Sequence, residues 1–169
     1  MKPILINKKL YKDNRGYFQE ILKINEIKFY NKIKFTAMSY SKKNVIRGLH
    51  FQKKKKQAKI ITIIKGKILD VCVNLNKKSK YFGKIYKFLL TPGKVLIIPN
   101  YYAHGFECLS NETYLFYHLD NYQDKKNEGG ILYNDKELKI NWRTKNPILS
   151  NRDENLMSFK EFKKKIKTL

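Results

Sequence analysis

The chain has 169 residues and a formal net charge of +23, from 37 basic and 14 acidic side chains, so it is long enough for one domain with its own core. Cys72 and Cys108 lie in apolar runs, which indicates reduced core thiols rather than a disulfide framework. No apolar stretch approaches the ~20 residues of a membrane span, and the first residues lack a signal-peptide pattern. We therefore expect a cytoplasmic protein that has no membrane partner.

The positive charge by itself would suggest a nucleic-acid partner. However, nearly all the basic residues are lysines, and the arginines are Arg15, Arg47, Arg143 and Arg152. Sequence-specific DNA readers rely on arginine, because its guanidinium fork matches base edges and phosphates. The lysines are spread from end to end, and no helix-turn-helix, zinc-finger or RNA-binding aromatic signature is present. We expect no nucleic-acid partner, whereas a smaller anion would be concentrated by the positive field.

Short apolar runs separated by turn residues predict a series of strands, at 17–22, 34–40, from 45 onward, and at 59–64, 68–73, 85–90, 95–98, 105–109 and 114–119. Gly66 lies between two of these runs and predicts a hairpin. Helices are expected at 24–30 and at 158–166, the second as a docked helix or a frayed lysine-rich tail. Many short strands with few helices are typical of a sandwich or barrel. With no repeat or linker in view, residues 1–169 are expected to form one domain.

The chain contains three histidines, His50, His104 and His118. Three imidazoles in a β-sandwich could bind a metal. Neither His50 nor His104 belongs to a His-x-His pair with a nearby Glu, which is the usual ligand pattern in such folds, so we expect no metal. Both histidines lie in segments with polar groups and glycine turns, which favours a chemical role over a place in the core.

Ten sequence blocks follow one another in a recognisable order and spacing, from about Asp13 to Asp153. They are 13–20, 44–52, 57–59, 70–71, 79–83, 98–106, 128–131, 134–135, 140–142 and 149–153. The ordered set resembles the dTDP-4-dehydrorhamnose 3,5-epimerases. The resemblance implies a mainly β, cupin-type jelly roll with short peripheral helices. It also implies a homodimer with an exchanged N-terminal strand, a nucleotide-diphosphate sugar as substrate, and no metal or organic cofactor.

The residue chemistry fits such a reaction. In a 4-keto sugar the hydrogens on C3 and C5 are both α to the carbonyl, so inverting either carbon requires a base, an acid on the opposite face and stabilisation of the enolate oxygen. By resemblance His50 is the base, and Asp153 pairs with it to orient the ring and favour the imidazolium. Tyr117 matches the acid. Lys59 lies where a positive charge can hold the oxyanion.

Further residues match substrate-contacting positions of the family. Arg15 and Arg47 match positions that contact the nucleotide sugar, and arginine can grip a phosphate with two hydrogen bonds. Other contact positions are matched by Glu20, His104, Glu128 and Arg152. Asp70 is a charged residue inside an apolar strand, so a buried partner is expected for it. We assign it to the support of the site rather than to the substrate.

Several residues depart from the family pattern. The segment 35–39, Phe-Thr-Ala-Met-Ser, replaces the usual Gln-x-Asn-x-Ser, so that Phe35 and Ala37 stand where the family has two polar substrate contacts. Gln123, next to Tyr122, stands where the family has an aromatic residue that stacks on thymine. His118 replaces a lysine that commonly follows the acid tyrosine, and Arg143 replaces a proline. The proton-transfer residues are intact while the substrate-reading residues are altered.

These departures leave alternatives open. One is an epimerase that acts at C3 only, or on a GDP-, CDP- or UDP-linked sugar. Another, from a different class, is a non-catalytic protein that binds a sugar nucleotide, against which the presence of the three proton-transfer residues argues. A metal-dependent enzyme of the same fold is a minor third.

Overall fold

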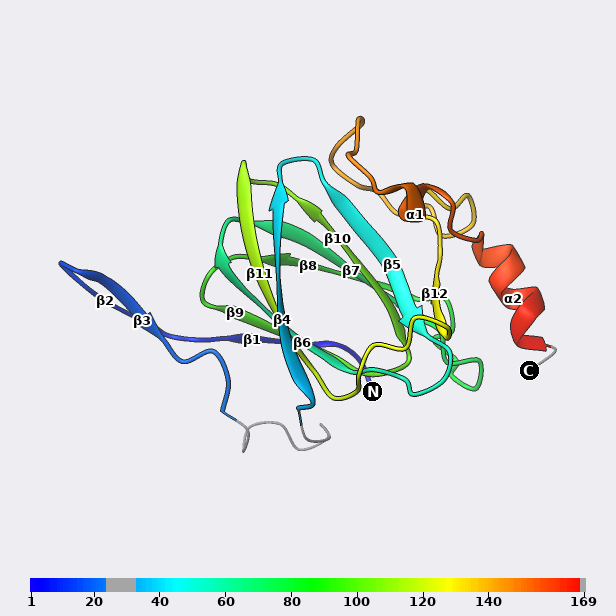
Figure 1. Cartoon of the computed structure of the whole chain (residues 1–169), viewed down its shortest axis with the longest axis horizontal. Helices are drawn as coiled ribbons and strands as arrows, with labels where there is room; N and C mark the ends of the chain where they lie inside the picture. Colours follow the sequence, from blue (N-terminus) through cyan, green and yellow to red (C-terminus); the bar gives the residue numbers. More distant parts are fainter. Residues whose placement is uncertain (24–32, 168–169) are drawn as a thin grey trace.

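The computed structural model describes residues 1–23 and 33–167, which form two five-stranded antiparallel sheets, a separate two-stranded hairpin and two short helices (Figure 1). The first sheet has the order β1-β9-β6-β11-β4, the second has the order β12-β5-β10-β7-β8, and the hairpin consists of β2 and β3. The bounds are β1 Ile4–Asn7, β2 Leu10–Asp13, β3 Gly16–Gln19, β4 Phe35–Lys42, β5 Ile46–Gln52, β6 Lys59–Lys65, β7 Ile68–Asn74, β8 Ile85–Leu90, β9 Lys94–Ile98, β10 Tyr102–Cys108, β11 Glu112–Leu119, β12 Glu128–Gly130, α1 Asn151–Glu154 and α2 Phe159–Lys167.

The two sheets pack face to face, and their inner faces form a hydrophobic core. Ile61, Leu96 and Leu115 of the first sheet belong to this core together with Cys72 and Phe106 of the second. All five are almost completely excluded from solvent. This two-sheet sandwich confirms the mainly β architecture expected from the many short apolar runs.

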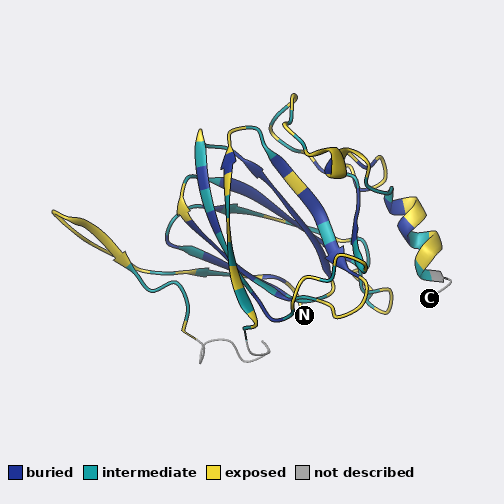
Figure 2. Cartoon of the chain, in the orientation of Figure 1, coloured by how far each residue is buried: buried dark blue, intermediate teal, exposed yellow. Residues whose placement is uncertain are grey.

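A third layer covers the outer face of the second sheet. Phe159 and Phe162 of α2 pack against Phe51, Val71 and Ala103 of that sheet. The two phenylalanines lie three residues apart and therefore on one face of the helix. Because β7 and β10 are buried on both faces, every residue in them is buried (Figure 2). Such strands read as continuous apolar runs rather than as alternating ones.

The β2–β3 hairpin lies outside the sandwich and projects away from it (Figure 1). Its residues are largely exposed, as the yellow colour of this arm in Figure 2 shows. The exposed side chains include Tyr11, Tyr17 and Phe18, and Phe18 is 65% exposed. Three exposed aromatic rings on one short arm are unusual for a surface that stays in water.

Most of the predicted elements are confirmed. The runs at 34–40, 59–64, 68–73, 85–90, 95–98 and 114–119 match strands to within two residues, and the helix at 158–166 is α2. The run at 17–22 corresponds to the shorter β3, and the run at 105–109 is the end of β10, which begins at Tyr102. Strands β1, β2 and β12 and helix α1 were not predicted. The helix expected at 24–30 lies outside the described residues.

The predicted hairpin around Gly66 is wrong. β6 pairs with β9 and β11 in the first sheet, whereas β7 pairs with β8 and β10 in the second. Gly66 therefore carries the chain from one sheet to the other. Its φ of 98° is in the region that favours glycine, and a Cβ there would collide with the backbone of Glu112. A turn signal shows where a strand ends but not which sheet the next strand joins.

Two glycines allow β5 and β10 to approach closely. A Cβ built on Gly48 would lie 2.6 Å from Cα of Gly105, and one built on Gly105 would lie 2.6 Å from the carbonyl oxygen of Arg47. The pairing of the two strands shifts register between His104 and Phe106 at the same place. Beside this contact His50 and His104 are direct cross-strand partners. The fold thus brings the two histidine segments together.

Candidate active site

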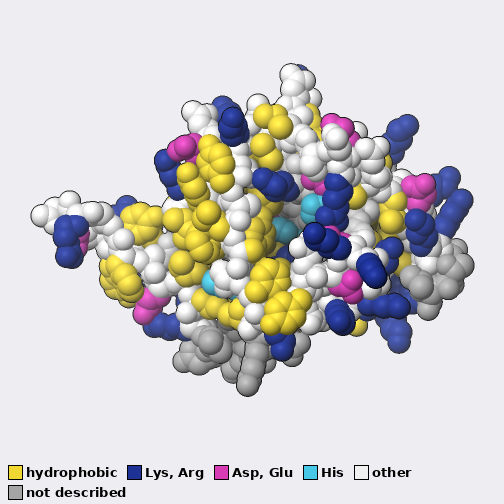
Figure 3. All heavy atoms as spheres, in the orientation of Figure 1, with side chains coloured by type: hydrophobic (Ala, Val, Ile, Leu, Met, Phe, Trp, Pro, Cys, Tyr) yellow, Lys and Arg dark blue, Asp and Glu magenta, His cyan; other side chains and the backbone are white. Residues whose placement is uncertain are grey.

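A cavity of about 330 Å³ is lined by side chains from strands of both sheets and from the chain around α1. Figure 3 shows histidine side chains at the bottom of a hollow in this face, with Lys and Arg side chains along its rim. The cavity brings together most of the residues assigned from the sequence. These are His50, Lys59, Tyr117 and Asp153, with Arg47, His104, Glu128 and Arg152.

His50 and Asp153 form a close pair in this cavity. Nε2 of His50 lies 2.5 Å from Oδ1 of Asp153. Helix α1 holds the carboxylate in place: Oγ of Ser150 accepts from the N–H of Asp153, and the N–H of Gly48 donates to its other oxygen at 3.5 Å. Burial raises the pKa of Asp153, but the hydrogen bond and electrostatic interaction with His50, together with the hydrogen bond from Gly48, outweigh that effect and hold the pKa below its usual value. An ionised Asp153 fixes the orientation of the His50 ring.

A second imidazole–carboxylate pair lies deeper. Nε2 of His104 is 2.7 Å from Oδ2 of Asp70, and the two side chains are 4% and 0% exposed. This is the buried partner expected for Asp70. Burial lowers the pKa of His104, although the Asp70 charge acts in the opposite direction. A neutral His104 that donates Nε2–H to Asp70 keeps Nδ1 as a hydrogen-bond acceptor.

Asp70 has a further donor that the sequence did not reveal. Sγ of Cys72 lies 3.5 Å from Oδ1 of Asp70, so that the thiol donates to the oxygen that His104 does not use. Burial raises the pKa of Cys72 well above its usual value, and the Asp70 charge adds to this effect. The thiol therefore remains protonated and can act as a donor.

Tyr117 and Lys59 reach the cavity from the first sheet. The hydroxyl of Tyr117 is 3.1 Å from Oγ of Ser39, on the neighbouring strand β4. Burial raises the pKa of Tyr117 far above that of a free phenol, so Tyr117 is a protonated acid at neutral pH. Burial lowers the pKa of Lys59, an effect that the charges of Glu128 and Asp70 oppose. The two side chains place an O–H and an N–H donor in the cavity.

The rim of the cavity carries two guanidinium groups. Nε of Arg47 donates to Oγ of Ser41 at 3.0 Å, and its Nη2 donates to the carbonyl oxygen of Tyr40. Arg152 forms an ion pair of 2.9 Å with Glu128, and the side-chain amide of Gln123 donates to the same carboxylate. Both guanidinium groups have N–H donors left for an anionic ligand.

Sequence reasoning missed three lining residues as members of the site, Ser39, Phe106 and Ser150. Ser39 could have been found from strand alternation, because β4 alternates between inward and outward residues and Ser39 is on the inward side. Phe106 and Ser150 lay inside the resemblance blocks, but no property of the residues themselves marked them.

Arg15 and Glu20 do not reach this cavity within one chain. Arg15 follows β2 in the turn of the projecting hairpin, where its side chain is 86% exposed and forms an ion pair with Asp13. Glu20 follows β3 and forms an ion pair with Lys23 at 2.8 Å. Neither residue lines the cavity, and both side chains are exposed, so they are accessible to another molecule.

Among residues 1–23 and 33–167, no group of three or more His, Cys, Asp or Glu side chains is arranged to hold a metal ion. Instead, His50 and His104 are each committed to one carboxylate. The same residues contain no helix of the length and apolar character that a membrane span requires.

Comparisons with known proteins agree with the geometry. A family model described as dTDP-4-dehydrorhamnose 3,5-epimerase matches residues 2–161. A dTDP-4-dehydrorhamnose 3,5-epimerase of Shigella flexneri is 36% identical over 163 residues, which cover 92% of this chain and 90% of the relative. A relative of the same name from Methanothermobacter thermautotrophicus is 33% identical over 168 residues, 94% of this chain and 90% of its own length.

Solved structures show the same similarity. The dTDP-4-dehydrorhamnose 3,5-epimerase of Bacillus anthracis, with TDP and PPi bound, aligns with a TM-score of 0.88 at 35% identity and covers 93% of this chain and 94% of its own. The enzyme of Legionella pneumophila, in complex with dTDP-4-keto-L-rhamnose, aligns with a TM-score of 0.87 at 29% identity, covering 92% and 87%. These matches confirm the cupin-type jelly roll expected from the resemblance. The chain therefore belongs to the dTDP-4-dehydrorhamnose 3,5-epimerase family, whose members are isomerases of nucleotide-linked sugars.

Proposed function

We propose that this protein inverts C3 and C5 of a nucleotide-linked 4-keto-6-deoxy sugar, by removing and returning protons through an enolate. One observation carries the proposal. An imidazole–carboxylate pair, His50 of the second sheet with Asp153 of α1, and a protonated phenol on the first sheet, Tyr117, line the same cavity. A base and an acid on opposite walls are what inversion of a carbon α to a ketone requires.

The proton moves from carbon to nitrogen in the first step. With Nε2–H donated to Asp153, Nδ1 of the neutral His50 ring takes the proton from C3 or C5. The electron pair of the broken C–H bond moves into the carbonyl and gives an enolate, while the ionised Asp153 stabilises the new imidazolium. Nζ of Lys59 donates to the enolate oxygen, because a donor placed where charge develops lowers the barrier.

The second step delivers a proton to the opposite face of the same carbon. The phenol of Tyr117 gives up its proton, the C–H bond forms with inverted configuration, and the ketone is restored. The hydroxyl of Ser39, 3.1 Å away, donates to the resulting phenolate. The cycle closes when His50 releases its proton to water and Tyr117 takes one back.

The nucleotide part is assigned to the cationic rim. Arg47 and Arg152 are placed to grip the diphosphate, and Glu128 orients Arg152 through their ion pair. His104 contacts the sugar, with Asp70 holding its ring from behind. Support comes from the Legionella pneumophila structure, which contains a dTDP-linked keto sugar and is 29% identical to this chain.

Arg15 and Glu20 would serve the cavity of a second copy of the chain in a homodimer. The projecting hairpin exposes the aromatic rings of Tyr11, Tyr17 and Phe18, so docking on a second copy would remove apolar surface from water. In that arrangement Arg15 would contact the nucleotide sugar bound in the cavity of the partner.

A mixing experiment tests the exchange. His50→Ala and Arg15→Gln chains, each nearly inactive alone, are co-expressed with different tags. If Arg15 serves the partner's cavity, a mixed dimer of twofold symmetry regains one intact cavity, and a random mixture recovers about a quarter of the wild-type activity. If Arg15 serves its own cavity, no cavity in the mixture is intact and activity stays at background.

Incubation with dTDP-4-keto-6-deoxyglucose in deuterated water, followed by NMR, tests the activity itself. We expect deuterium at C3 and at C5 and a product inverted at both carbons. Deuterium at C3 alone would favour the narrower reaction, which the name of a dTDP-4-dehydrorhamnose 3-epimerase of Streptomyces niveus, 32% identical over 127 residues, describes. Tight binding without exchange would leave a non-catalytic binder of sugar nucleotides.

A further inference from the structure

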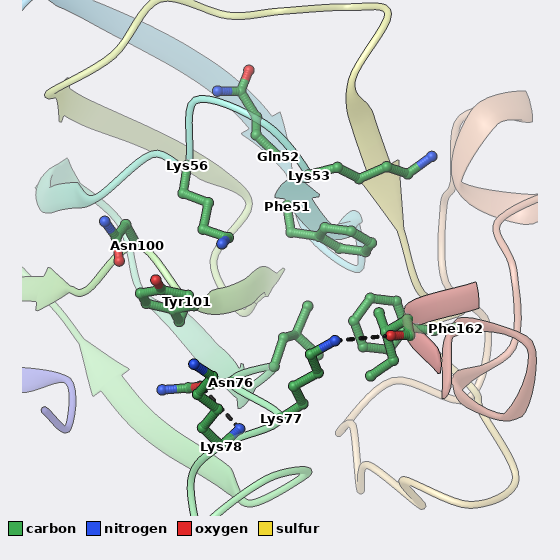
Figure 4. A pocket seen from close by; sticks show the side chains of 12 residues that line it. Phe51, Gln52, Lys53, Lys56, Asn76, Lys77, Lys78, Asn100, Tyr101 and Phe162 are labelled. Carbon is green, nitrogen blue, oxygen red and sulfur yellow. Dashed lines mark hydrogen bonds between the residues drawn. The ribbon is translucent and has the colours of Figure 1, made fainter. Parts of the chain in front are cut away.

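A second cavity, of about 450 Å³, lies between the outer face of the second sheet and α2 (Figure 4). Its volume is within the range of about 300–1,000 Å³ that is typical of small-molecule sites. None of the described residues that line it also lines the active cavity. It is therefore a separate site, although Phe51 on its wall directly follows His50 in β5.

The inner part of this cavity is apolar and aromatic. The rings of Phe51 and Phe162 meet edge to face with centroids 5.1 Å apart, and Leu75 and Ile166 extend the same surface. Tyr101 lies opposite and is 43% exposed. Such a surface binds a planar or apolar group, because contact with it removes apolar area from water.

The rim is cationic, and the part of the chain that the structure describes supplies no counterion to it. Lys53, Lys56, Lys77 and Lys78 line the cavity, and none of the lining residues that the structure describes is acidic. No carboxylate of the described residues forms an ion pair with these four lysines. The charges therefore add up rather than cancel, and they attract an anion.

Two of the lysines point into the space between Tyr101 and Phe162 (Figure 4). Nζ of Lys56 lies 4.3 Å from the centre of the Tyr101 ring, and Nζ of Lys77 donates to the carbonyl oxygen of Ile166 at 3.1 Å. These contacts hold the two ammonium groups near the aromatic surface and use at most one of the three N–H donors of each. Lys56 and Lys77 are thus placed to hold an anionic group whose body rests on the rings.

We propose that this cavity binds a small phosphate ester with a planar ring. The phosphate is held by Lys56 and Lys77, the ring lies against Phe51 and Tyr101, and the side-chain amides of Asn76 and Asn100 donate from the rim. The apolar surface distinguishes such a ligand from inorganic phosphate, and the lysine pair distinguishes it from an uncharged aromatic compound.

Calorimetry at low salt with phenyl phosphate as the probe tests the proposal. Inorganic phosphate contains only the charged group of the probe, and benzyl alcohol contains only an aromatic ring without the phosphate. Each is expected to bind about tenfold more weakly than phenyl phosphate or not at all. Lys56→Gln with Lys77→Gln should weaken phenyl phosphate binding by about tenfold or more. Because both side chains are at the surface, glutamine at these positions leaves the core intact.

Lys42→Gln with Lys43→Gln is the matched control, since it removes the same charge from exposed positions that line neither cavity. Binding should stay within about twofold of wild type in this control. An equal loss in both double variants would show that the general positive field, and not this cavity, attracts the probe. Inorganic phosphate binding as tightly as phenyl phosphate would likewise overturn the proposal.

Arg47→Gln separates this cavity from the active one. Arg47 lines only the active cavity, so Arg47→Gln should weaken only the binding of any phenyl phosphate held there, whereas binding that depends on Lys56 and Lys77 should remain. Weaker binding in Arg47→Gln, with none lost in the lysine double variant, would place the probe in the active cavity. The assay measures no turnover, so its outcome is independent of the proposed epimerase activity.

Discussion

Nε2 of His50 lies 2.5 Å from Oδ1 of Asp153, although 103 residues separate the two in the chain. Asp153 belongs to a four-residue helix, which begins after Ser150 and is held against β5 by the N–H of Gly48. The pair therefore forms only when the segment that follows the jelly-roll strands has returned to β5.

Replacing His50 by alanine removes the base. We expect wash-in of solvent deuterium at C3 to fall by a factor of about 10²–10⁴, the usual contribution of a general base. NMR of the sugar in deuterated water measures the effect, and binding of dTDP serves as a control for an intact cavity. Exchange at nearly the wild-type rate in the variant would rule out His50 as the base.

Tyr117→Phe keeps the ring but removes the proton donor. His50 can still form the enolate and reprotonate it from its own side, so exchange should survive better than inversion. The ratio of deuterium wash-in to epimerised product is the quantity to measure. If both rates fall equally, the two roles are not separate.

The stability of the protein should decrease as the pH falls below about 6.5, the usual pKa of histidine. Burial lowers the pKa of His104 in the folded state, so the unfolded chain binds more protons and unfolding becomes easier in acid. His118, whose pKa burial also lowers, acts in the same direction. Urea titrations between pH 5 and pH 8 measure the slope.

His104→Gln is the matched variant for this measurement, because its amide nitrogen can take the place of Nε2 and still donate to Asp70. The slope of unfolding free energy against pH should be smaller in the variant, while the part due to His118 remains. An unchanged slope would show that the pKa of His104 is not lowered in the folded protein.

Discrimination for thymine should be weak. Gln123 donates to Glu128 instead of offering a ring, and the neighbouring Tyr122 stacks on Phe35 with centroids 6.1 Å apart and planes 11° apart. The loss of a base stack costs roughly 1–3 kcal/mol, by analogy with single-stranded nucleic acids, or about one to two powers of ten in affinity.

Competition among dTDP-, GDP-, CDP- and UDP-linked 4-keto sugars measures this discrimination. The grip of Arg47 on the diphosphate does not depend on the base, so all four should compete. A preference for dTDP above about a hundredfold would show that the Phe35–Tyr122 pair replaces the missing aromatic residue.

Activity should persist after exhaustive chelation, since side chains carry out all the proposed steps, with His50 as the base, Tyr117 as the acid and Lys59 as the donor to the enolate oxygen. The rate with the dTDP-linked substrate, before and after dialysis against a chelator, is the measurement. Loss of activity that a divalent ion restores would instead favour the metal-dependent alternative.

The sequence predicts the strands well, because alternating or continuous apolar runs depend on local spacing. It also identifies most of the residues that line the cavity: Lys59, Tyr117 and Asp153 reach it although they lie far apart in the sequence. Prediction from the sequence fails where an element or contact depends on residues that are far away in the chain. β1 was missed because its four residues are ordered by pairing with β9, about 90 residues later. The thiol of Cys72 could not be linked to Asp70 because strand spacing alone does not fix a rotamer.

The position of Arg15 illustrates the same difficulty in another form. A family block identifies it as a contact residue, but the block does not say in which molecule the contact is made. The turn that contains Arg15 is stabilised locally by Asp13, so it forms in the same way whatever the direction of the β2–β3 hairpin. Assembly with a second chain, and not the local sequence, would decide which cavity Arg15 serves.

The close approach of β5 and β10 at Gly48 and Gly105 has a consequence for how the site can change by mutation. A methyl group at either position would lie 2.6 Å from the backbone of the other strand and would push His50 away from His104. Even alanine, which is chemically inert, is excluded there. Mutation is therefore restricted at two positions whose residues contribute no functional group to the site.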